Sequence, residues 1–349
     1  MRKLVFVTQQ VDPGHPALAA TVPKIRALAA RVDEVVVLAD RTVAGALPGN
    51  CRPLSFAART RAGRGARFQA ALAGELKARP DAVLAHMCPI YALLAAPLVR
   101  PLRIPLLLWY THWARTRTHR AAARAATVIV TVDRRSFPIE SGKVVPIGHG
   151  IDLDEFPCAD RSGGADDFRL AALGRYSRAK GLETILRGVQ LAIERGVDTR
   201  LEVFGPALNA AEREHRSELE RLVAELGLEK RVRLGHAILR AEVPEVLARA
   251  RALVNNMEAG APDKVVYEAA ASCLPVVVSN PVFDELTGGL PLSLMFARGD
   301  PSDLADRIGE LAALAPAERA SLGRALHDRV AAGHSVDHWA DGVLAVAAR

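Results

Sequence analysis

One stretch of the chain reads Gly174-Arg175-Tyr176-Ser177-Arg178-Ala179-Lys180-Gly181 and directly follows the apolar run Phe168 to Leu173. The apolar run predicts a buried strand, and a helix is expected to open at Gly181. The stretch therefore places Arg175 and Lys180, five positions apart, on a loop at the carboxyl end of a strand. In an open α/β sheet, ligands bind at this end of the strands. Two fixed cations beside a helix start suit a diphosphate.

A second stretch, about ninety residues later, combines a helical carboxylate with a strand. It reads Glu268-Ala269-Ala270-Ala271-Ser272-Cys273-Leu274-Pro275-Val276-Val277. A helix is expected over 264–273, and the Leu-Pro step leads into a strand over 276–279. A carboxylate on a helix can hold sugar hydroxyls through charge-assisted hydrogen bonds.

Other pieces of the chain stand in a matching order around these two stretches. Pro146-Ile147-Gly148-His149-Gly150-Ile151-Asp152 is followed by Phe156, and Val232-Arg233-Leu234-Gly235-His236 precedes the expected helix at 243–249. Together they resemble the retaining family 4 glycosyltransferases of the GT-B fold, the glycosyl transferases group 1. That family has G-R-x(4)-K-G for the donor diphosphate, P-x-G-x-G-I/V-D-x-x-x-F as a linker, and a Glu-x7-Glu loop and helix. The resemblance covers nearly the whole chain.

Strand and helix patterns alternate from end to end, which favours an α/β fold with doubly wound parallel sheets. Strands are expected at 4–8, 35–39, 82–86, 105–110, 127–132, 170–174, 201–205, 232–234, 252–255 and 276–279. Helices are expected at 17–31, 67–79, 90–99, 118–125, 182–196, 210–226, 243–249 and 264–273, with further helical patterns from residue 302 onward. The resemblance implies GT-B, with two Rossmann-like domains facing a cleft. The expected bounds are 1–157 for the acceptor-side domain, 158–335 for the nucleotide-sugar-binding domain, and 336–349 for a closing helix that returns to the first domain.

Several other α/β classes lack their motifs here. The turn after the first strand holds Pro13-Gly14-His15-Pro16 rather than G-x-G-x-x-G, which argues against a dinucleotide-binding domain. No G-x-x-x-x-G-K-[ST] loop is present, which argues against a nucleoside triphosphatase. No G-x-S-x-G elbow is present, which argues against an α/β-hydrolase.

Charge is unevenly distributed along the 349 residues. Residues 1–157 hold 22 Lys and Arg against 11 Asp and Glu, a net charge of 22 − 11 = +11, and the remainder holds 24 against 28, or −4. This asymmetry predicts that the first half meets an anionic acceptor or a membrane surface. Two groups of arginines stand out: Arg59, Arg61, Arg64 and Arg67 on an expected glycine-containing loop, and Arg115, Arg117, Arg120 and Arg124 after Trp113. The alternative is a solvated basic face. No nucleic-acid-binding motif accompanies the charge.

The four cysteines, Cys51, Cys88, Cys158 and Cys273, have no paired spacing, so neither a zinc site nor a disulfide framework is expected. Residues 4–7 predict a first strand rather than the apolar core of a secretion signal. The longest apolar run, 104–110, is far shorter than the ~20 residues of a membrane span. We expect a cytoplasmic protein, or a peripheral one on the inner face of a membrane.

Arg175 and Lys180 are the first catalytic candidates, with Gly174 as a donor-binding residue of the same loop. When the bond from the anomeric carbon to the diphosphate breaks, negative charge grows on the leaving phosphate oxygen. Cations fixed at that place stabilise the transition state more than the ground state. The alternative is that both are solvated surface residues, as most arginines and lysines are.

The resemblance assigns Glu268 to the ribose hydroxyls of the nucleotide. Its alternative is a helix-face ion pair with Lys264 at i, i+4, and both roles can hold at once. Eight residues before Glu268 the family has a Glu, but here Gly260 stands in that place and Glu258 lies two residues upstream. Lys264, in the expected first helical turn, is a candidate cation for the donor. The family's contact from this Glu to the donor sugar is therefore absent at position 260, and the sequence does not identify the sugar.

Three further candidates lie in the first half. His112 resembles the family's histidine that contacts the donor sugar near the reacting carbon, and it is the third catalytic candidate. His86 ends another apolar strand, and Gly14 resembles the glycine of the first loop that approaches the diphosphate. The alternatives are structural histidines and an ordinary turn glycine.

The sequence therefore predicts a retaining glycosyltransferase that moves a hexose from a nucleotide diphosphate sugar to an acceptor that it does not identify, such as a lipid-linked or polysaccharide precursor. No metal ligand and no cofactor are expected, and no carboxylate pair of the glycosidase kind stands out. Two alternatives remain: a nucleotide-sugar 2-epimerase of the same architecture, and a nucleotide-sugar-binding pseudoenzyme that has lost the first Glu.

Overall fold

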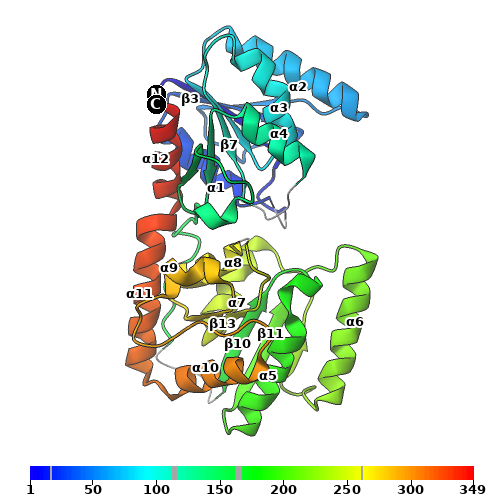
Figure 1. The fold of residues 1–349 in the computed structure, drawn as a ribbon, viewed down its shortest axis with the longest axis vertical. Helices are drawn as coiled ribbons and strands as arrows, with labels where there is room; N and C mark the ends of the chain where they lie inside the picture. Colours follow the sequence, from blue (N-terminus) through cyan, green and yellow to red (C-terminus); the bar gives the residue numbers. More distant parts are fainter. Residues whose placement is uncertain (16–17, 112–115, 162–166, 261) are drawn as a thin grey trace. The chain divides into compact units, whose positions relative to one another are not determined.

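The computed structural model describes residues 1–15, 18–111, 116–161, 167–260 and 262–349 (Figure 1). The chain divides into two compact units, Met1–Asp152 together with Gly333–Arg349, and Leu153–Ala332. The domain bounds expected from the sequence stay a prediction. His112, Trp113 and Arg115 lie outside the described residues.

The first unit is built on a seven-stranded sheet in which every neighbouring pair is parallel. Its strands, in spatial order, are β5 (Cys51–Ser55), β3 (Glu34–Ala39), β1 (Lys3–Val7), β6 (Ala82–His86), β7 (Leu106–Trp109), β8 (Val128–Thr131) and β9 (Val144–Pro146). A small parallel ribbon joins β2 (Gln10–Val11) to β4 (Arg41–Thr42). The order reverses beside β1, which is the switch point of a doubly wound sheet.

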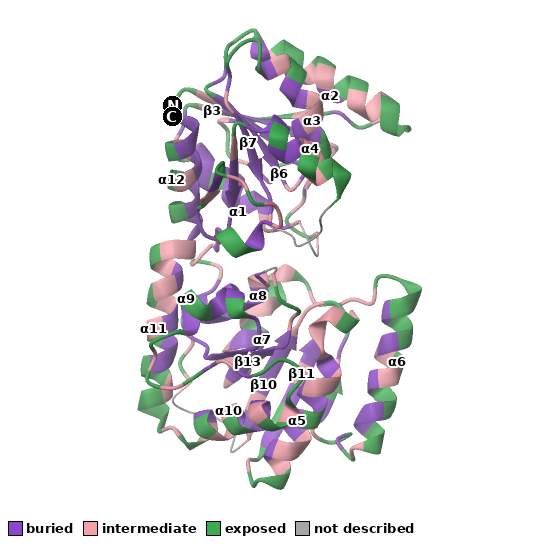
Figure 2. Cartoon of the chain, in the orientation of Figure 1, coloured by how far each residue is buried: buried purple, intermediate pink, exposed green. Residues whose placement is uncertain are grey.

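Helices cover both faces of this sheet, so its central strands β3, β1, β6 and β7 are buried on both sides (Figure 2). Val5 and Val7 of β1 share a core with Phe68 and Tyr91, which belong to the helices on one face. The alternate residue Phe6 stacks on His86, and His86 meets Trp339 of the opposite face. The helices are α2 (Arg61–Leu76), α3 (Pro89–Val99) and α4 (Arg117–Ala125) on the first face, and α1 (Thr21–Ala29) and α12 (Val336–Ala347) on the second.

The glycines of the Pro146–Asp152 motif hold the backbone close to Gly333 and His334, just before α12. Gly148 has φ +74, and a Cβ there would lie 1.9 Å from the Gly333 carbonyl oxygen. The Gly150 and Ile151 amides both donate to the His334 carbonyl, at 3.0 and 2.8 Å. The motif therefore has a packing role inside the first unit.

The second unit is built on a five-stranded parallel sheet, again with helices around it. Its strands, in spatial order, are β12 (Val232–Leu234), β11 (Thr199–Phe204), β10 (Phe168–Leu173), β13 (Ala252–Asn255) and β14 (Val276–Val278). Its α-helices are α5 (Leu182–Glu194), α6 (Ala210–Glu225), α7 (Val243–Arg249), α8 (Lys264–Ala271), α9 (Asp284–Thr287), α10 (Pro301–Ala313) and α11 (Pro316–His334). The expected class, α/β with two Rossmann-like parallel sheets, is confirmed.

Two expectations were wrong. Arg61, Arg64 and Arg67 lie on α2 and not on a loop, because Thr60 caps the helix by accepting from the Gly63 amide at 3.0 Å. Cys158 and Cys273 form a disulfide across 115 positions, which no spacing rule reveals. The other two cysteines are free and buried. Among the described helices, none has the length and apolar character to cross a bilayer.

Candidate functional site

The Gly174 loop begins directly after β10, at the carboxyl end of the sheet, where the sequence placed it. Gly174 has φ +137, and a Cβ on it would lie 2.6 Å from both Cε and Nζ of Lys180. Lys180 thus folds back over Gly174, and only glycine leaves room for it. A Cβ on Gly205 would lie 1.8 Å from the Gly174 carbonyl oxygen, so the loop after β11 also comes very close.

Tyr176 fixes the middle of this loop. Its side chain is completely buried, and its hydroxyl donates to the Gly235 carbonyl at 2.7 Å. Its amide donates to the Pro206 carbonyl at 3.2 Å. Two motifs singled out in the sequence, around Arg175 and around Gly235, are therefore joined by one hydrogen bond. The rigid anchor orients the residues on either side of it.

Lys180 forms an ion pair with Asp263, the residue just before α8, and both side chains are mostly buried. The same Asp263 Oδ2 accepts from the Asn255 side-chain amide at 2.7 Å. Gly181, in the left-handed region at φ +52, then starts α5, and its carbonyl accepts from Asn256 Nδ2 at 3.0 Å. The Lys180 ammonium is therefore held between β10, β13 and the start of α8.

Arg175 lies at the same edge but is more open. Its guanidinium is 3.2 Å from Glu212 Oε1, and its side chain keeps 54% of its surface exposed. A pocket of about 10 Å³, room for about one water molecule, is lined by both candidate cations, Arg175 and Lys180, and by Gly174 and Asn255. The structure thus brings Gly174, Arg175 and Lys180 together.

Glu268 is buried on α8 and lies in a network of opposite charges. Its Oε1 is 2.8 Å from Lys264 Nζ and 2.8 Å from Arg240 Nη1, and Arg240 also pairs with Glu155. Burial raises the pKa of Glu268, but Lys264 and Arg240 outweigh it and hold that pKa below 4.5. The expected pair with Lys264 is present. Among the described residues, nothing donates to Glu268 Oε2.

The segment before α8 differs from the family pattern at the position of the first Glu. Gly260 has φ +114, a conformation in which a glutamate would be strained. The Glu258 side chain is exposed, and its amide donates to the Ala179 carbonyl at 3.0 Å. The loop that holds Glu258 is therefore tied to the turn that holds Lys180, but the carboxylate of Glu258 points to solvent.

The candidates of the first half lie in the other unit. His86 is buried between Phe6, Trp109 and Trp339, and burial together with Lys24 holds its pKa well below 6.5. Neither ring nitrogen of His86 has a hydrogen-bond partner among the described residues, and its donor-binding role stays a prediction. Gly14 is exposed, and its amide donates to Asp12 Oδ1 at 2.9 Å in a local turn.

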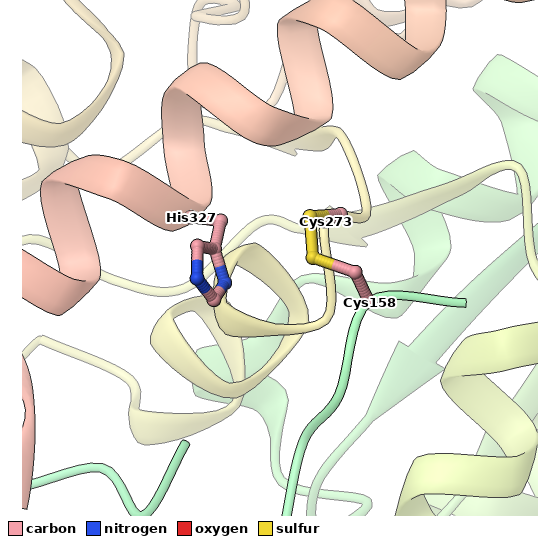
Figure 3. Close-up of side chains that lie close together, drawn as sticks. All are labelled: Cys158, Cys273 and His327. Carbon is pink, nitrogen blue, oxygen red and sulfur yellow. A yellow bond between two sulfur atoms is a disulfide. The ribbon is translucent and has the colours of Figure 1, made fainter. Parts of the chain in front are cut away.

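Sequence reasoning missed three direct partners of the predicted residues: Asp263 pairs with Lys180, Glu212 with Arg175, and Arg240 with Glu268. It also missed Asn255, which donates to Asp263. One feature of the sequence could have indicated Asp263, namely its position just before the helix expected at 264. No sequence pattern indicated Arg240, because it contacts Glu268 from a short 3₁₀ turn 28 positions earlier in the chain. The group of described residues that could hold a metal ion lies elsewhere, at Cys158, Cys273 and His327 (Figure 3).

Residues 167–313 match the family model described as glycosyl transferases group 1. The chain resembles this family. The matched segment contains the Gly174 loop, the Glu212 carboxylate, and Glu268 with its partners Lys264 and Arg240, and it lies within the second unit. No curated protein sequence matches the chain.

Solved structures share the fold over almost the whole chain. HepE from Anabaena, in complex with UDP and glucose, has a TM-score of 0.77 at 17% identity, with 99% of each chain covered. Sucrose-phosphate synthase from Thermosynechococcus elongatus has a TM-score of 0.76 at 17% identity, covering 99% of this chain and 98% of that one. WaaG, a glycosyltransferase of lipopolysaccharide biosynthesis, has a TM-score of 0.66 at 16% identity, covering 98% and 99%. The chain therefore has the GT-B fold.

Proposed function

We propose that the chain is a retaining glycosyltransferase that moves a hexose from a nucleotide diphosphate sugar to an acceptor, without a metal ion in the reaction. The family match of residues 167–313 supports a glycosyltransferase with a nucleotide-sugar donor. The observation that carries the proposal is the Gly174 loop, which holds Lys180 and Arg175 together at the carboxyl end of β10. HepE binds UDP and UDP-glucose, which makes UDP-sugars the first donors to test.

In this proposal Lys180 and Arg175 bind the diphosphate of the donor. Both lie on a loop that Tyr176 anchors, so little reorganisation is needed when charge develops on the leaving oxygen. When the donor binds, the Lys180 ammonium leaves Asp263 and pairs with phosphate oxygens. The Arg175 guanidinium likewise leaves Glu212 and pairs with phosphate oxygens. Each carboxylate keeps a hydrogen-bond donor after its cation has left. Asp263 still accepts from the Asn255 side-chain amide, and Glu212 still accepts from the Leu208 backbone amide at 2.7 Å.

Glu268 is proposed to hold the ribose of the nucleotide. Lys264 and Arg240 keep the carboxylate ionised and fix its Oε1, which leaves Oε2 to accept from a hydroxyl. A carboxylate held this firmly by two cations is suited to binding and is a poor proton donor or acceptor near neutral pH. This argues against the 2-epimerase, which needs acid and base carboxylates at the sugar.

The reaction itself needs no protein base in this proposal. The acceptor hydroxyl attacks the face of the sugar that the diphosphate leaves, and its proton passes to the leaving phosphate oxygen. The protein then supplies orientation and positive charge. His112 is proposed to contact the donor sugar near the reacting carbon.

The test is incubation of the chain with labelled UDP-, GDP- and ADP-sugars, with binding measured in parallel by calorimetry. Sugar transfer or donor hydrolysis, at equal rates with and without EDTA, is the expected result. Formation of an epimer would identify the 2-epimerase. Binding without any turnover would identify the pseudoenzyme, which the glycine at position 260 and the exposed Glu258 favour.

The first unit is proposed to meet an anionic acceptor or a membrane surface that carries it. The supporting observation is its basic character together with exposed arginines on two helices. These are Arg61 and Arg67 on α2 and Arg117, Arg120 and Arg124 on α4.

A further inference from the structure

Two cysteines and a histidine from three separate elements of the second unit converge at one place (Figure 3). Cys158 lies on the segment before β10, Cys273 follows α8, and His327 lies on α11. The two sulfur atoms are joined in a disulfide, and the ligand atoms of all three residues lie within 4.8 Å of one another. Nothing in the proposed transfer reaction uses these residues.

At this cluster the backbone of α11 lies very close to the backbone that follows α8. A Cβ on Gly323 would lie 2.0 Å from the Cys273 carbonyl oxygen, so only glycine lets α11 pass this near to the end of α8. His327 lies four residues after Gly323, on the same face of α11. Cys273 itself has φ +57, which turns the chain sharply after α8. The histidine therefore comes close to the disulfide because Gly323 has no side chain and because Cys273 adopts a left-handed backbone conformation.

The hydrogen bond of His327 decides which of its ring nitrogens is open. Nδ1 lies 2.6 Å from the Ala271 carbonyl oxygen. A carbonyl only accepts, so Nδ1 carries the hydrogen in the neutral ring, and Nε2 carries the lone pair. Metal-bound histidines show this arrangement, with the second nitrogen donating to a backbone carbonyl.

We propose that Cys158, Cys273 and His327 form a redox-gated site for a thiophilic divalent metal ion, with Zn²⁺ as the best fit. Two thiolates and one imidazole are ligands that zinc prefers, and a solvent molecule completes its tetrahedron. In the oxidised chain the sulfurs are bonded to each other and cannot bind the ion as thiolates. A dithiol reductant gives two electrons and two protons to the disulfide, which yields two thiols and the oxidised reductant. Zn²⁺ then displaces the two thiol protons and binds both sulfurs.

Access to the cluster is open. Cys158 is exposed, and both cysteines line a cavity of about 470 Å³ together with Pro275 and Pro316. The same cavity is lined by Arg161 and other arginines. The two thiolates neutralise the charge of the ion, so the zinc-bound cluster adds no net positive charge beside these side chains.

The experiment compares zinc content in two redox states of the full chain. The protein is reduced with a phosphine, loaded with Zn²⁺, desalted and assayed for metal, in parallel with the oxidised protein. We expect one equivalent in the reduced chain and less than a tenth of an equivalent in the oxidised chain. Co²⁺ loading of the reduced chain should give the absorption of a cobalt–thiolate bond. Peptide mapping of the oxidised chain should show the linked Cys158 and Cys273 peptides.

Variants separate this site from adventitious binding. Cys158→Ser and His327→Gln should each lower zinc affinity by at least tenfold, whereas Cys51→Ala and His236→Gln should retain it. Circular dichroism shows that each variant is folded before metal is added. Equal zinc content in the reduced wild type and in folded Cys158→Ser, or in the reduced and oxidised wild type, would overturn the proposal.

Discussion

Lys180 and Asp263 are joined by an ion pair that links the loop after β10 to the start of α8, although they stand 83 positions apart. Asp263 has a second partner, because the same Oδ2 accepts from the Asn255 side-chain amide at 2.7 Å. Any anion that binds Lys180 therefore competes with a fixed carboxylate. The strength of this competition should set part of the affinity for the donor diphosphate.

The first prediction concerns this competition. Asp263→Asn keeps the hydrogen bonding with Asn255 and removes the negative charge. Because the variant removes the carboxylate charge that competes for the Lys180 ammonium, the affinity for a nucleoside diphosphate should rise, by about tenfold for each ~1.4 kcal/mol that this mostly buried pair contributes. Calorimetric titration measures the change. Asp303→Asn, on α10 of the same unit, is the matched control. Weaker binding by Asp263→Asn would show that Asp263 positions Lys180 for the diphosphate and does not compete with it.

The second prediction separates the two ends of the donor. Glu268→Ala should weaken binding of the free nucleoside diphosphate, because Glu268 is assigned to the ribose. His112→Ala should lower turnover and leave that binding intact. Titration with the nucleotide alone and turnover with the sugar donor measure the two effects. The assignment fails if Glu268→Ala binds the nucleotide normally while His112→Ala loses it.

The third prediction concerns pH. Burial and His338 lower the pKa of His334 from 6.5 to about 4, although Asp133 acts in the opposite direction. Between about pH 6.5 and 4, the unfolded chain therefore binds more protons than the folded chain, so stability falls as the pH falls through this window. One pKa unit corresponds to about 1.4 kcal/mol, which gives a loss of up to about 3 kcal/mol. The lowered pKa of His86 acts in the same direction.

Urea unfolding at pH 7 and at pH 5 measures this effect. His334→Gln has no group to protonate, so its free energy of unfolding should change less between the two pH values than that of the wild type. His236→Gln, an exposed histidine of the other unit, should behave as the wild type does. An unchanged pH dependence in His334→Gln would refute the role of His334.

Much of the fold could be predicted because buried parallel strands are short apolar runs bounded by polar residues. β6, β12, β13 and α7 have the bounds expected from the sequence. β5 was missed, since Cys51–Ser55 contains Pro53 and a charged residue, which are tolerated because the strand lies at the edge of its sheet. β9 was missed because it has only three residues and ends at Pro146, the first residue of the motif that the resemblance assigns to a linker. β12 is equally short, but it lies in a motif that the resemblance marks as a strand.

The site was predictable only where it is local in sequence. The Gly174 loop and the pair of Lys264 with Glu268 follow from spacing within one loop or helix. Asp263 and Arg240 reach their partners across the sheet, so only the three-dimensional structure reveals them. The disulfide between Cys158 and Cys273 is equally non-local.

The fourth prediction concerns the basic arginines of the first unit. Arg59, Arg61 and Arg67 are exposed, and each basic residue near an anionic lipid surface contributes about 1 kcal/mol. Co-sedimentation with anionic vesicles should therefore be detectable at low salt, fade with added salt, and drop by about a hundredfold when all three are changed to Gln. The matched control changes three exposed arginines of the second unit, Arg187, Arg213 and Arg221.

Vesicles without anionic lipid should not bind the chain. Equal and negligible binding to neutral and anionic vesicles at low salt would contradict a membrane surface and leave a water-soluble acceptor as the partner of this unit.

The central claim is that Lys180 and Arg175 stabilise the charge that develops on a nucleotide diphosphate leaving group. The most direct measurement is the rate of nucleoside diphosphate release from a labelled UDP-sugar by the wild type and by Lys180→Ala and Arg175→Ala. Arg178→Ala is the control, because Arg178 lies on the same loop but is exposed and pairs with Glu218. We expect turnover to fall by about 10²–10³ in the first two variants and to stay near wild type in the third. Turnover close to wild type in both Lys180→Ala and Arg175→Ala would contradict the assignment.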